Sequence, residues 1–346
     1  MEKNINNLEN KEKRNNYRVI DGLRTFFYVL AINILASIFY SIIVFVINIF
    51  YKGTYNDLVN SPFIYYIGLL IIPVSFLVAF YVFNKTNKIN VKNAIAPTKK
   101  FNIWSLFIVI ALVGLMIVGF MPIINMLLSV LENAGMNMGS DAMYPMDSWI
   151  RIILGFFAYA VLPAVAEELL FRGIIFRGLS RRATSFCAVL VSALMFCLMH
   201  GGIQQTIYQF ILGLLLGFVA LYTGNIIFPM IMHFLNNFMV VLLQLVNGYN
   251  SFLGGFKQSF VGYLCAIGIA LGASALIVLL VWLLKKINCK DEKDEQYLVE
   301  GENIIIEEKA KKMGFKDFIL SFDFNEKFYF YASVLVGLII WIFNSF

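Results

Sequence analysis

Residues 152–179 read IILGFFAYAVLPAVAEELLFRGIIFRGL, an apolar run that contains four charged residues. The run is longer than the about 20 helical residues that cross a bilayer core, so we expect Ile174–Leu179 to emerge among the lipid headgroups. Eight other apolar runs contain no Asp, Glu, Lys or Arg. The sequence therefore predicts nine membrane-spanning helices, at 26–50, 62–83, 103–131, 148–179, 184–200, 204–222, 226–247, 259–284 and 328–346.

The composition of the whole chain is typical of a membrane protein. Of its 346 residues, 60% are hydrophobic and only 14% are charged, whereas a soluble domain is nearer half apolar and a quarter charged. This excludes an ordinary soluble protein and a disordered one. The cysteines show no CxxC spacing, which predicts neither a disulfide framework nor a zinc knuckle. The predicted fold class is all-α, a polytopic transmembrane helical bundle.

Lys and Arg are distributed unevenly over the predicted loops. Four segments hold 24 of the 27: six up to Arg24, five in 84–102, four in 172–182 and nine in 285–327. The other three fall on the alternate side, at Lys52, Arg151 and Lys257. Because short loops rich in Lys and Arg stay in the cytoplasm, this split predicts a multi-pass protein of the cell membrane with a cytoplasmic N-terminus.

The runs divide the chain into four regions. They are a cytoplasmic N-terminal segment (1–25), a transmembrane bundle (26–284) with its core at about 148–247, a charged cytoplasmic loop (285–327) and a C-terminal transmembrane helix (328–346). The charged loop mixes nine Lys with 11 of the 21 acidic residues, which is typical of a solvated surface. A protein partner docking on this loop is the alternative. Nine spans place the C-terminus outside, and one re-entrant segment would change its side.

Five ionisable residues other than Tyr and Cys remain inside the predicted spans: Glu167, Glu168, Arg172, His200 and His233. A charge at the bilayer centre costs at least about 2.5–3.5 kcal/mol, so we expect these groups to face one another in a polar cavity. Glu168 and Arg172 are i,i+4 and favour an ion pair. Glu167 points about 100° away from Glu168 and is left to face the cavity.

Two further i,i+4 pairs lie on later spans, Phe196 with His200 and His233 with Asn237. A buried carboxylate beside a neutral imidazole can take a proton from water, which would let Glu167 and His200 activate a hydrolytic water. An imidazole N–H and an amide N–H suit an oxyanion, which would be the task of His233 and Asn237. Arg172 would neutralise and orient Glu168.

The same residues also fit other interpretations. A membrane Glu–Arg pair is often a structural clasp between helices, and a single membrane histidine is more often a packing residue than a catalyst. Two His and two Glu could bind zinc, although HExxH is absent. A proton or solute pathway would also use buried carboxylates, with helices broken at Pro73, Pro122, Pro163 and Pro229.

Three motifs in order resemble the signature of one family: Glu167-Glu168-x-x-x-Arg172, Phe196-x-x-x-His200 and His233-x-x-x-Asn237. The chain resembles, over about 150–245, the CPBP family of CAAX proteases and bacteriocin-processing enzymes, also called Abi proteins. These intramembrane glutamic endopeptidases include the type II CAAX prenyl endopeptidases. The resemblance implies about eight core helices, to which this chain adds an extra C-terminal helix. It implies water activation by Glu167 and His200 and oxyanion stabilisation by His233 and Asn237, with no cofactor and no metal.

We therefore expect a metal-independent intramembrane endopeptidase whose substrate is a peptide or protein at the inner membrane face. Arg177, Arg181 and Arg182 are expected to surround the cavity mouth there. By family analogy the substrates would be leader peptides, secreted peptides or tails of lipid-anchored proteins. The frequent use of the amino acids Asn, Ile and Lys favours a bacterial source with an AT-rich genome. The lipid bilayer is an expected partner, and no binding to nucleic acid is expected. The alternative is a non-proteolytic membrane scaffold or bacteriocin-immunity factor that keeps the protease fold.

Overall fold

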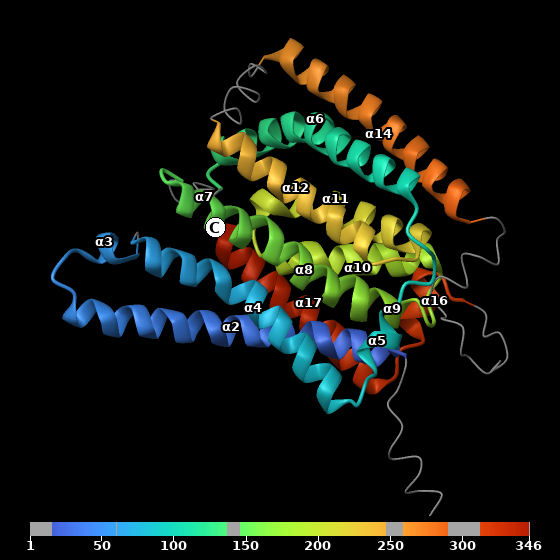
Figure 1. The fold of residues 1–346 in the computed structure, drawn as a ribbon, viewed down its shortest axis with the longest axis horizontal. Coiled ribbons are helices and arrows are strands. Elements are labelled where there is room, and N and C mark those ends of the chain that lie inside the picture. Colours follow the sequence, from blue (N-terminus) through green and yellow to red (C-terminus); the bar gives the residue numbers. More distant parts are fainter. Residues whose placement is uncertain (1–15, 60, 137–145, 247–258, 290–311, 346) are drawn as a thin grey trace, which may run out of the picture.

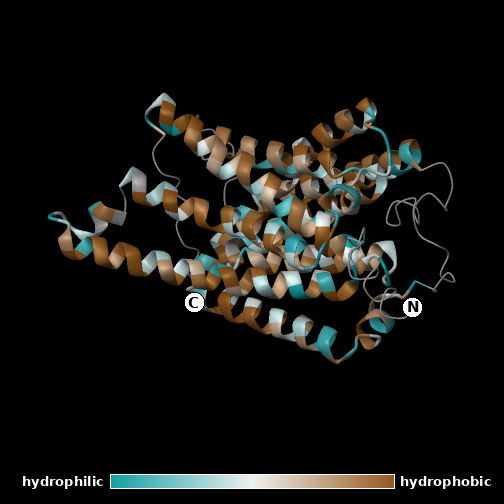
Figure 2. Ribbon diagram, turned by 60° about the horizontal axis from the view of Figure 1, so that its bottom comes forward, coloured by the Kyte–Doolittle hydropathy of each residue, from teal (hydrophilic) through white to brown (hydrophobic). Residues whose placement is uncertain are grey.

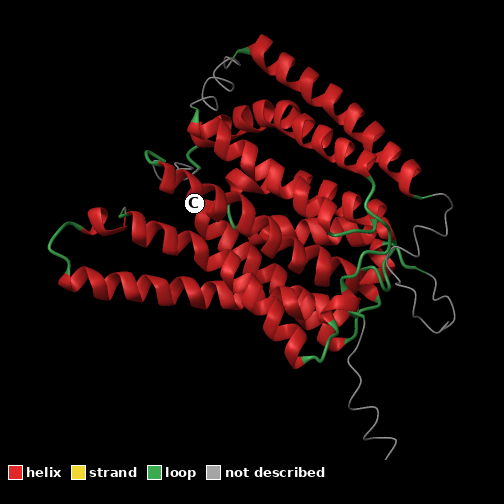
Figure 3. Ribbon diagram, in the orientation of Figure 1, coloured by secondary structure: helices red, strands yellow, loops and turns green. Residues whose placement is uncertain are grey.

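The computed structural model describes residues 16–59, 61–136, 146–246, 259–289 and 312–345. Within these ranges the chain is helical, apart from loops and one isolated bridge between Ala183 and Met313 (Figure 3). The predicted fold class, an all-α polytopic bundle, is confirmed.

The helices follow the apolar runs closely, since a long apolar run buries its backbone hydrogen bonds in lipid only as a helix. The long ones are α2 (Val19–Phe50), α4 (Pro62–Thr86), α6 (Ile103–Asn133), α10 (Ser185–Met199), α11 (Ile203–Thr223), α12 (Ile227–Leu245), α14 (Phe260–Asn288) and α17 (Phe324–Ser345). The predicted span 148–179 becomes a continuous helix in five parts, α7 (Trp149–Phe156), η1 (Phe157–Val161), α8 (Leu162–Glu168), η2 (Leu169–Ile175) and α9 (Phe176–Leu179). Short helices complete the set: α3 (Tyr55–Val59), α5 (Val91–Ala94) and α16 (Phe315–Leu320).

Eight of the nine predicted spans are long and apolar enough to cross a membrane. The exception is α10, whose 15 residues rise only about 22 Å, less than the about 30 Å of a hydrocarbon core. It ends at Met199 with His200 as its C-cap, and Gly201 adopts a left-handed φ of 61° that starts the turn into α11. Helix α10 starts from one end of the bundle, and α11 returns to that same end. The short length of α10 therefore does not change the end of the bundle at which α12 and the later helices begin.

The turns of the bundle gather at two ends (Figure 1). We call the basic end the one with the turns 87–90, 180–184 and 224–226, on the right of Figure 1. The opposite end carries the turn 51–54 and the start of α7, on the left of the same view. The long helices between the two ends are coloured mainly as hydrophobic in Figure 2. Outward side chains such as Leu35, Phe39 and Phe45 are more than 60% exposed, which suits contact with lipid.

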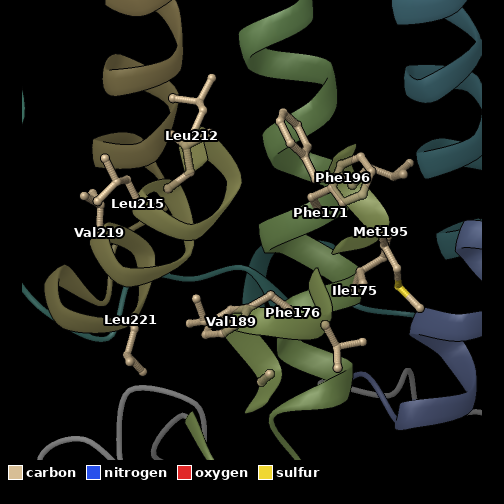
Figure 4. Packing of buried hydrophobic residues seen from close by; sticks show 14 of the residues in the cluster. Phe171, Ile175, Phe176, Val189, Met195, Phe196, Leu212, Leu215, Val219 and Leu221 are labelled. Carbon is tan, nitrogen blue, oxygen red and sulfur yellow. The ribbon is translucent and has the colours of Figure 1, made fainter. Parts of the chain in front are cut away.

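The half of the bundle near the basic end is filled by a buried hydrophobic cluster (Figure 4). Phe171 and Phe196 are fully buried and meet edge to face, with ring centroids 5.1 Å apart. Phe176 and Leu179 continue the cluster toward the turn 180–184. Helices η2, α9, α10 and α11 are thereby fixed against one another; Arg172 lies in η2, and His200 directly follows α10.

The end of the charged insertion packs on the basic end of the bundle. Met313 exchanges backbone hydrogen bonds of 2.9 Å with Arg182 and Thr184. Phe318 and Phe322, in and just after α16, are 0% and 3% exposed and belong to the main cluster. Residues 290–311 lie outside the described residues, so the expected solvated surface stays a prediction there. The last helix begins at Phe324, earlier than the predicted residue 328.

Helix α17 runs beside α10 from one end of the bundle toward the other. Near its start, Arg182 donates to Glu326 at 2.5 Å. Near its end, Asn344 donates to the carbonyl of Gly201 at 2.7 Å, and Trp341 donates to Thr206 at 2.6 Å. The additional C-terminal helix therefore holds the turn that follows His200.

Candidate active site

The helix from Trp149 to Leu179 is interrupted on both sides of the glutamate pair. Pro163 has no N–H to give to the carbonyl of Tyr159, four residues earlier, so the regular ladder fails there. The π-helical turns η1 and η2 lie directly before and after α8. Turns of this kind are frequent at functional sites because the extra residue re-aims neighbouring side chains. They set the direction of Glu167 and Glu168 relative to the rest of the bundle.

Glu168 is the anchor of the site. Arg172 donates from Nη1 to Glu168 Oε1 at 2.8 Å and from Nη2 to the carbonyl of Gly213 at 3.0 Å. The same Oε1 lies 3.0 Å from Nδ1 of His233. Glu168 is 0% exposed, and Arg172 and His233 are 2% and 1% exposed. Arg172 also lies over the ring of Phe196, 4.8 Å from its centroid. The pair thus joins η2, α11 and α12 and orients the imidazole of His233.

Glu167 faces away from that anchor. Its Oε2 lies 3.9 Å from Nε2 of His200 and 3.9 Å from Nε2 of His233. The atom is buried and has no hydrogen-bond partner among the described residues. A separation of 3.9 Å is too long for a direct hydrogen bond and is suited to a bridging water.

His200 has a defined tautomer when neutral. Its Nδ1 lies 2.9 Å from the carbonyl oxygen of Phe196, one turn back on α10. A carbonyl can only accept, so Nδ1 carries the hydrogen and Nε2 presents a lone pair toward Glu167. The i,i+4 spacing of Phe196 and His200 therefore has a backbone reason as well as a packing one.

Asn237 belongs to a chain of hydrogen bonds across the bundle. Its Nδ2 donates at 3.2 Å to the carbonyl of Tyr159, which Pro163 leaves without its usual partner. Its Oδ1 accepts from Asn236 at 3.2 Å, and Asn236 accepts from the hydroxyl of Tyr208 at 2.5 Å. These bonds fix the amide, and the second N–H of Asn237 Nδ2 is left for another acceptor.

A cavity of about 550 Å³ opens beside these residues. Glu167, His200 and Asn237 line it together with side chains of α4, α6 and α11. His233 lies behind Glu167, while Glu168 and Arg172 form the buried support. The structure therefore brings the histidines to Glu167, and Arg172 and His233 to Glu168, while Asn237 shares the cavity wall with Glu167 and His200.

Two of the arginines predicted at the cavity mouth lie elsewhere. Arg177 donates to the carbonyls of Ala94, Ile95 and Ala96 at 2.8–3.2 Å. Arg182 is bound to Glu326, and neither arginine lines the cavity. The prediction of a basic ring at the mouth is wrong for both, because Arg177 bonds the carbonyls of a neighbouring turn and Arg182 pairs with a carboxylate of α17.

Sequence reasoning missed the neutral polar residues of the cavity wall. They are Asn125, Gln205, Tyr208, Gln209, Asn236 and Gln244. Each is an amide or hydroxyl within an otherwise apolar run. An inventory of neutral amides in the spans, beside that of ionisable groups, would have found them.

The side chains of the type that zinc prefers nearest one another are Glu167, His200 and His233. Within the described ranges, no group of three or more His, Cys, Asp and Glu side chains has an arrangement that could hold a metal ion.

The left-handed turn after His200 gives a first prediction. A Cβ at Gly201 would lie 3.0 Å from Ile340 and 3.3 Å from Asn344, at a φ of +61°. A left-handed conformation costs a non-glycine residue about 1–2 kcal/mol, so Gly201→Ala should lower the free energy of unfolding by that amount and displace His200. Gly268→Ala is the control, because nothing lies within 4 Å of that position in α14. Thermal unfolding in detergent measures both, and equal midpoints would contradict this account of the turn.

Comparison with known proteins gives one result. Residues 149–239 match the family described as type II CAAX prenyl endopeptidase Rce1-like. No curated protein and no solved structure matches the chain. The match confirms the family resemblance drawn from the three motifs and contains all six predicted site residues. Together with eight helices long enough to cross a membrane, it supports a multi-pass membrane protease of the CAAX type.

Proposed function

We propose, on the premise that residues 149–239 are a CAAX-type protease segment, that the protein is an intramembrane glutamic endopeptidase that hydrolyses a peptide bond without a metal ion. The observation that carries the proposal is the position of Glu167 Oε2, buried, unpartnered among the described residues and 3.9 Å from two imidazole nitrogens. A carboxylate in that setting is suited to deprotonate one water molecule in a cavity that a peptide can enter.

The first half of the reaction uses Glu167 and His200. A water held between Glu167 Oε2 and His200 Nε2 gives a proton to this pair while its oxygen attacks the scissile carbonyl carbon. The proton is then passed to the leaving nitrogen as the C–N bond breaks. Because His200 Nδ1 is bonded to the Phe196 carbonyl, its Nε2 is the nitrogen that faces the water.

The oxyanion of the tetrahedral intermediate is assigned to Asn237 and His233. Asn237 has a second amide hydrogen beyond the one given to Tyr159. His233 gives Nδ1–H to Glu168, so its Nε2 donates to an oxyanion only when the ring carries both protons. Preorganised donors of this kind typically contribute 10²–10³-fold to the rate (~2.7–4 kcal/mol).

Chelation separates this mechanism from a zinc hydrolase. We expect 1,10-phenanthroline or EDTA to leave the cleavage rate of the purified protein unchanged, since no step requires a metal. A loss of activity that added Zn²⁺ restores would contradict the metal-independent mechanism and leave the protease assignment intact.

The proposal is tested in cells by comparing peptides. Cells with the wild-type protein and cells with Glu167→Gln are analysed by mass spectrometry of their secreted and membrane peptides. We expect at least one precursor to accumulate, and its cleaved product to disappear, in the variant. Identical peptides in cells in which the protein has a measurable phenotype would instead favour a non-proteolytic scaffold.

A further inference from the structure

The cavity occupies only one half of the bundle. The lining residues nearest the basic end are Asn236, nine residues from the start of α12, and Phe76, ten residues from the end of α4. At about 1.5 Å per residue they lie about 14–15 Å from that end. In the other direction the lining reaches Tyr65, in the first turn of α4, and Gln244, next to the last residue of α12. The cavity therefore extends from Glu167 toward the opposite end.

The half on the basic side is filled. Phe171 and Phe196 are fully buried directly beyond the glutamate pair. Phe228, near the start of α12, is also fully buried and stacks on Phe101 with ring centroids 4.7 Å apart. Figure 4 shows aromatic and aliphatic side chains of this cluster between the helices. A peptide approaching from the basic end meets this packed cluster before it reaches Glu167.

The basic end itself is tied together by hydrogen bonds. Arg177 joins α9 to the segment after α5 through three carbonyl oxygens. Lys312 donates to the carbonyls of Ser180 and Arg181 at 2.9 and 3.0 Å. Phe318 of α16 is fully buried in the main hydrophobic cluster. Arg177 and Lys312 therefore hold turns in place, and neither lines the cavity.

Charge distribution assigns the two ends to the two sides of a membrane. The segments that hold 24 of the 27 Lys and Arg begin or end at the basic end, whereas Lys52 and Arg151 lie at the opposite end. By the positive-inside rule the basic end is cytoplasmic. We infer that the substrate reaches Glu167 from the extracytoplasmic side, which reverses the inner-face approach expected from the sequence. This inference rests on the proposed protease function, and it makes the substrate an exported or membrane-anchored segment in place of a cytoplasmic tail.

The cavity wall defines the chemistry of that segment. Carboxamides recur along it: Asn125, Gln205, Gln209, Asn236 and Gln244. Gln209 Oε1 and Gln244 Oε1 are buried and have no hydrogen-bond partner among the described residues, so they are acceptors available to peptide N–H groups. Glu167 is the one acidic side chain in the described lining, which contains no Lys or Arg. The site suits an extended, uncharged stretch of peptide backbone around the scissile bond.

Cysteine labelling tests the direction of entry. Gln244→Cys places a thiol at the outer part of the cavity, and Lys52→Cys and Lys100→Cys mark the opposite and basic ends, where both lysines are exposed. A membrane-impermeant cationic methanethiosulfonate is added either to intact cells or to inverted membrane vesicles. All three variants are made in a protein that carries Cys265→Ser and Cys289→Ser, because Cys265 is exposed and Cys289 is half-buried. That protein without a further cysteine is the background control, since its remaining Cys187 and Cys197 are buried.

We expect Gln244→Cys and Lys52→Cys to be labelled in intact cells, with complete loss of this labelling in inverted vesicles, where only Lys100→Cys reacts. Labelling of Gln244→Cys only in inverted vesicles, or in neither preparation, would overturn extracytoplasmic entry. Labelling of Lys52→Cys only in inverted vesicles would overturn it as well.

The labelling does not depend on catalysis. If the labelling contradicts extracytoplasmic entry while the protein still cleaves its precursor through Glu167, only the inferred direction of access is wrong. If the labelling is as expected but the protein shows no Glu167-dependent cleavage, the proposed protease function is contradicted and the inference of an outward-facing cavity still holds.

Discussion

Glu167→Gln is expected to abolish most of the peptide hydrolysis by the purified protein, with a fall in kcat of about 10²–10⁴-fold, the usual contribution of a general base. The amide is nearly the same size as the carboxylate but cannot accept the proton of the attacking water. Because Glu167 makes no hydrogen bond through Oε2 to another described residue, the substitution should leave the fold and the KM little changed. Cleavage of the precursor identified in cells, followed over time, gives both constants.

The matched control for this substitution is Glu132→Gln, at the exposed end of α6. It removes the same charge from the same type of residue, away from the cavity. We expect wild-type kinetics for Glu132→Gln. Equal rates for the two variants would mean that Glu167 is not the base.

Arg172→Met is expected to have the largest effect on stability. It removes the cation from a buried pair whose side chains are 1% and 0% exposed, and it leaves Glu168 as an uncompensated buried charge. Breaking a buried pair in this way costs about 3–5 kcal/mol. The free energy of unfolding in detergent, measured by denaturant titration, should fall by this amount, and His233 should lose its fixed orientation because Glu168 Oε1 serves both residues.

Two further variants bracket that result. Arg151→Met removes a partly exposed ion pair with Asp147, which should cost at most about 1 kcal/mol. Adding Glu168→Gln to Arg172→Met removes the orphaned charge and should recover much of the lost stability without restoring activity. If Arg172→Met were no more destabilising than Arg151→Met, the buried pair would not be the anchor of the site.

Helices could be predicted from the sequence because lipid forces an apolar run to satisfy its own backbone hydrogen bonds. Five of the six candidate site residues could be predicted for a related reason, since ionisable groups are costly in a span unless they meet. The sixth, Asn237, was predicted from its i,i+4 spacing to His233. The π-helical turns η1 and η2 could not be predicted, because their sequences are equally compatible with an α-helix.

The position of the charged side chains around the bundle was harder to predict. Arg177 bonds to carbonyls more than 80 residues away in sequence, and nothing local indicates that contact. The buried end of the charged insertion had a signal that charge counting hid, since Phe315, Phe318 and Phe322 recur at helical spacing. The neutral amides of the cavity other than Asn237 were missed, because only ionisable groups were counted as costly in lipid.

The central claim is that Glu167 and His200 act on the same water. A double-mutant cycle of Glu167→Gln and His200→Ala, measured as kcat/KM on the identified precursor, tests it most directly. Residues that act as a unit are strongly non-additive, so we predict that the double variant is no slower than the slower single variant. Two independent losses that multiply in the double variant would contradict the claim.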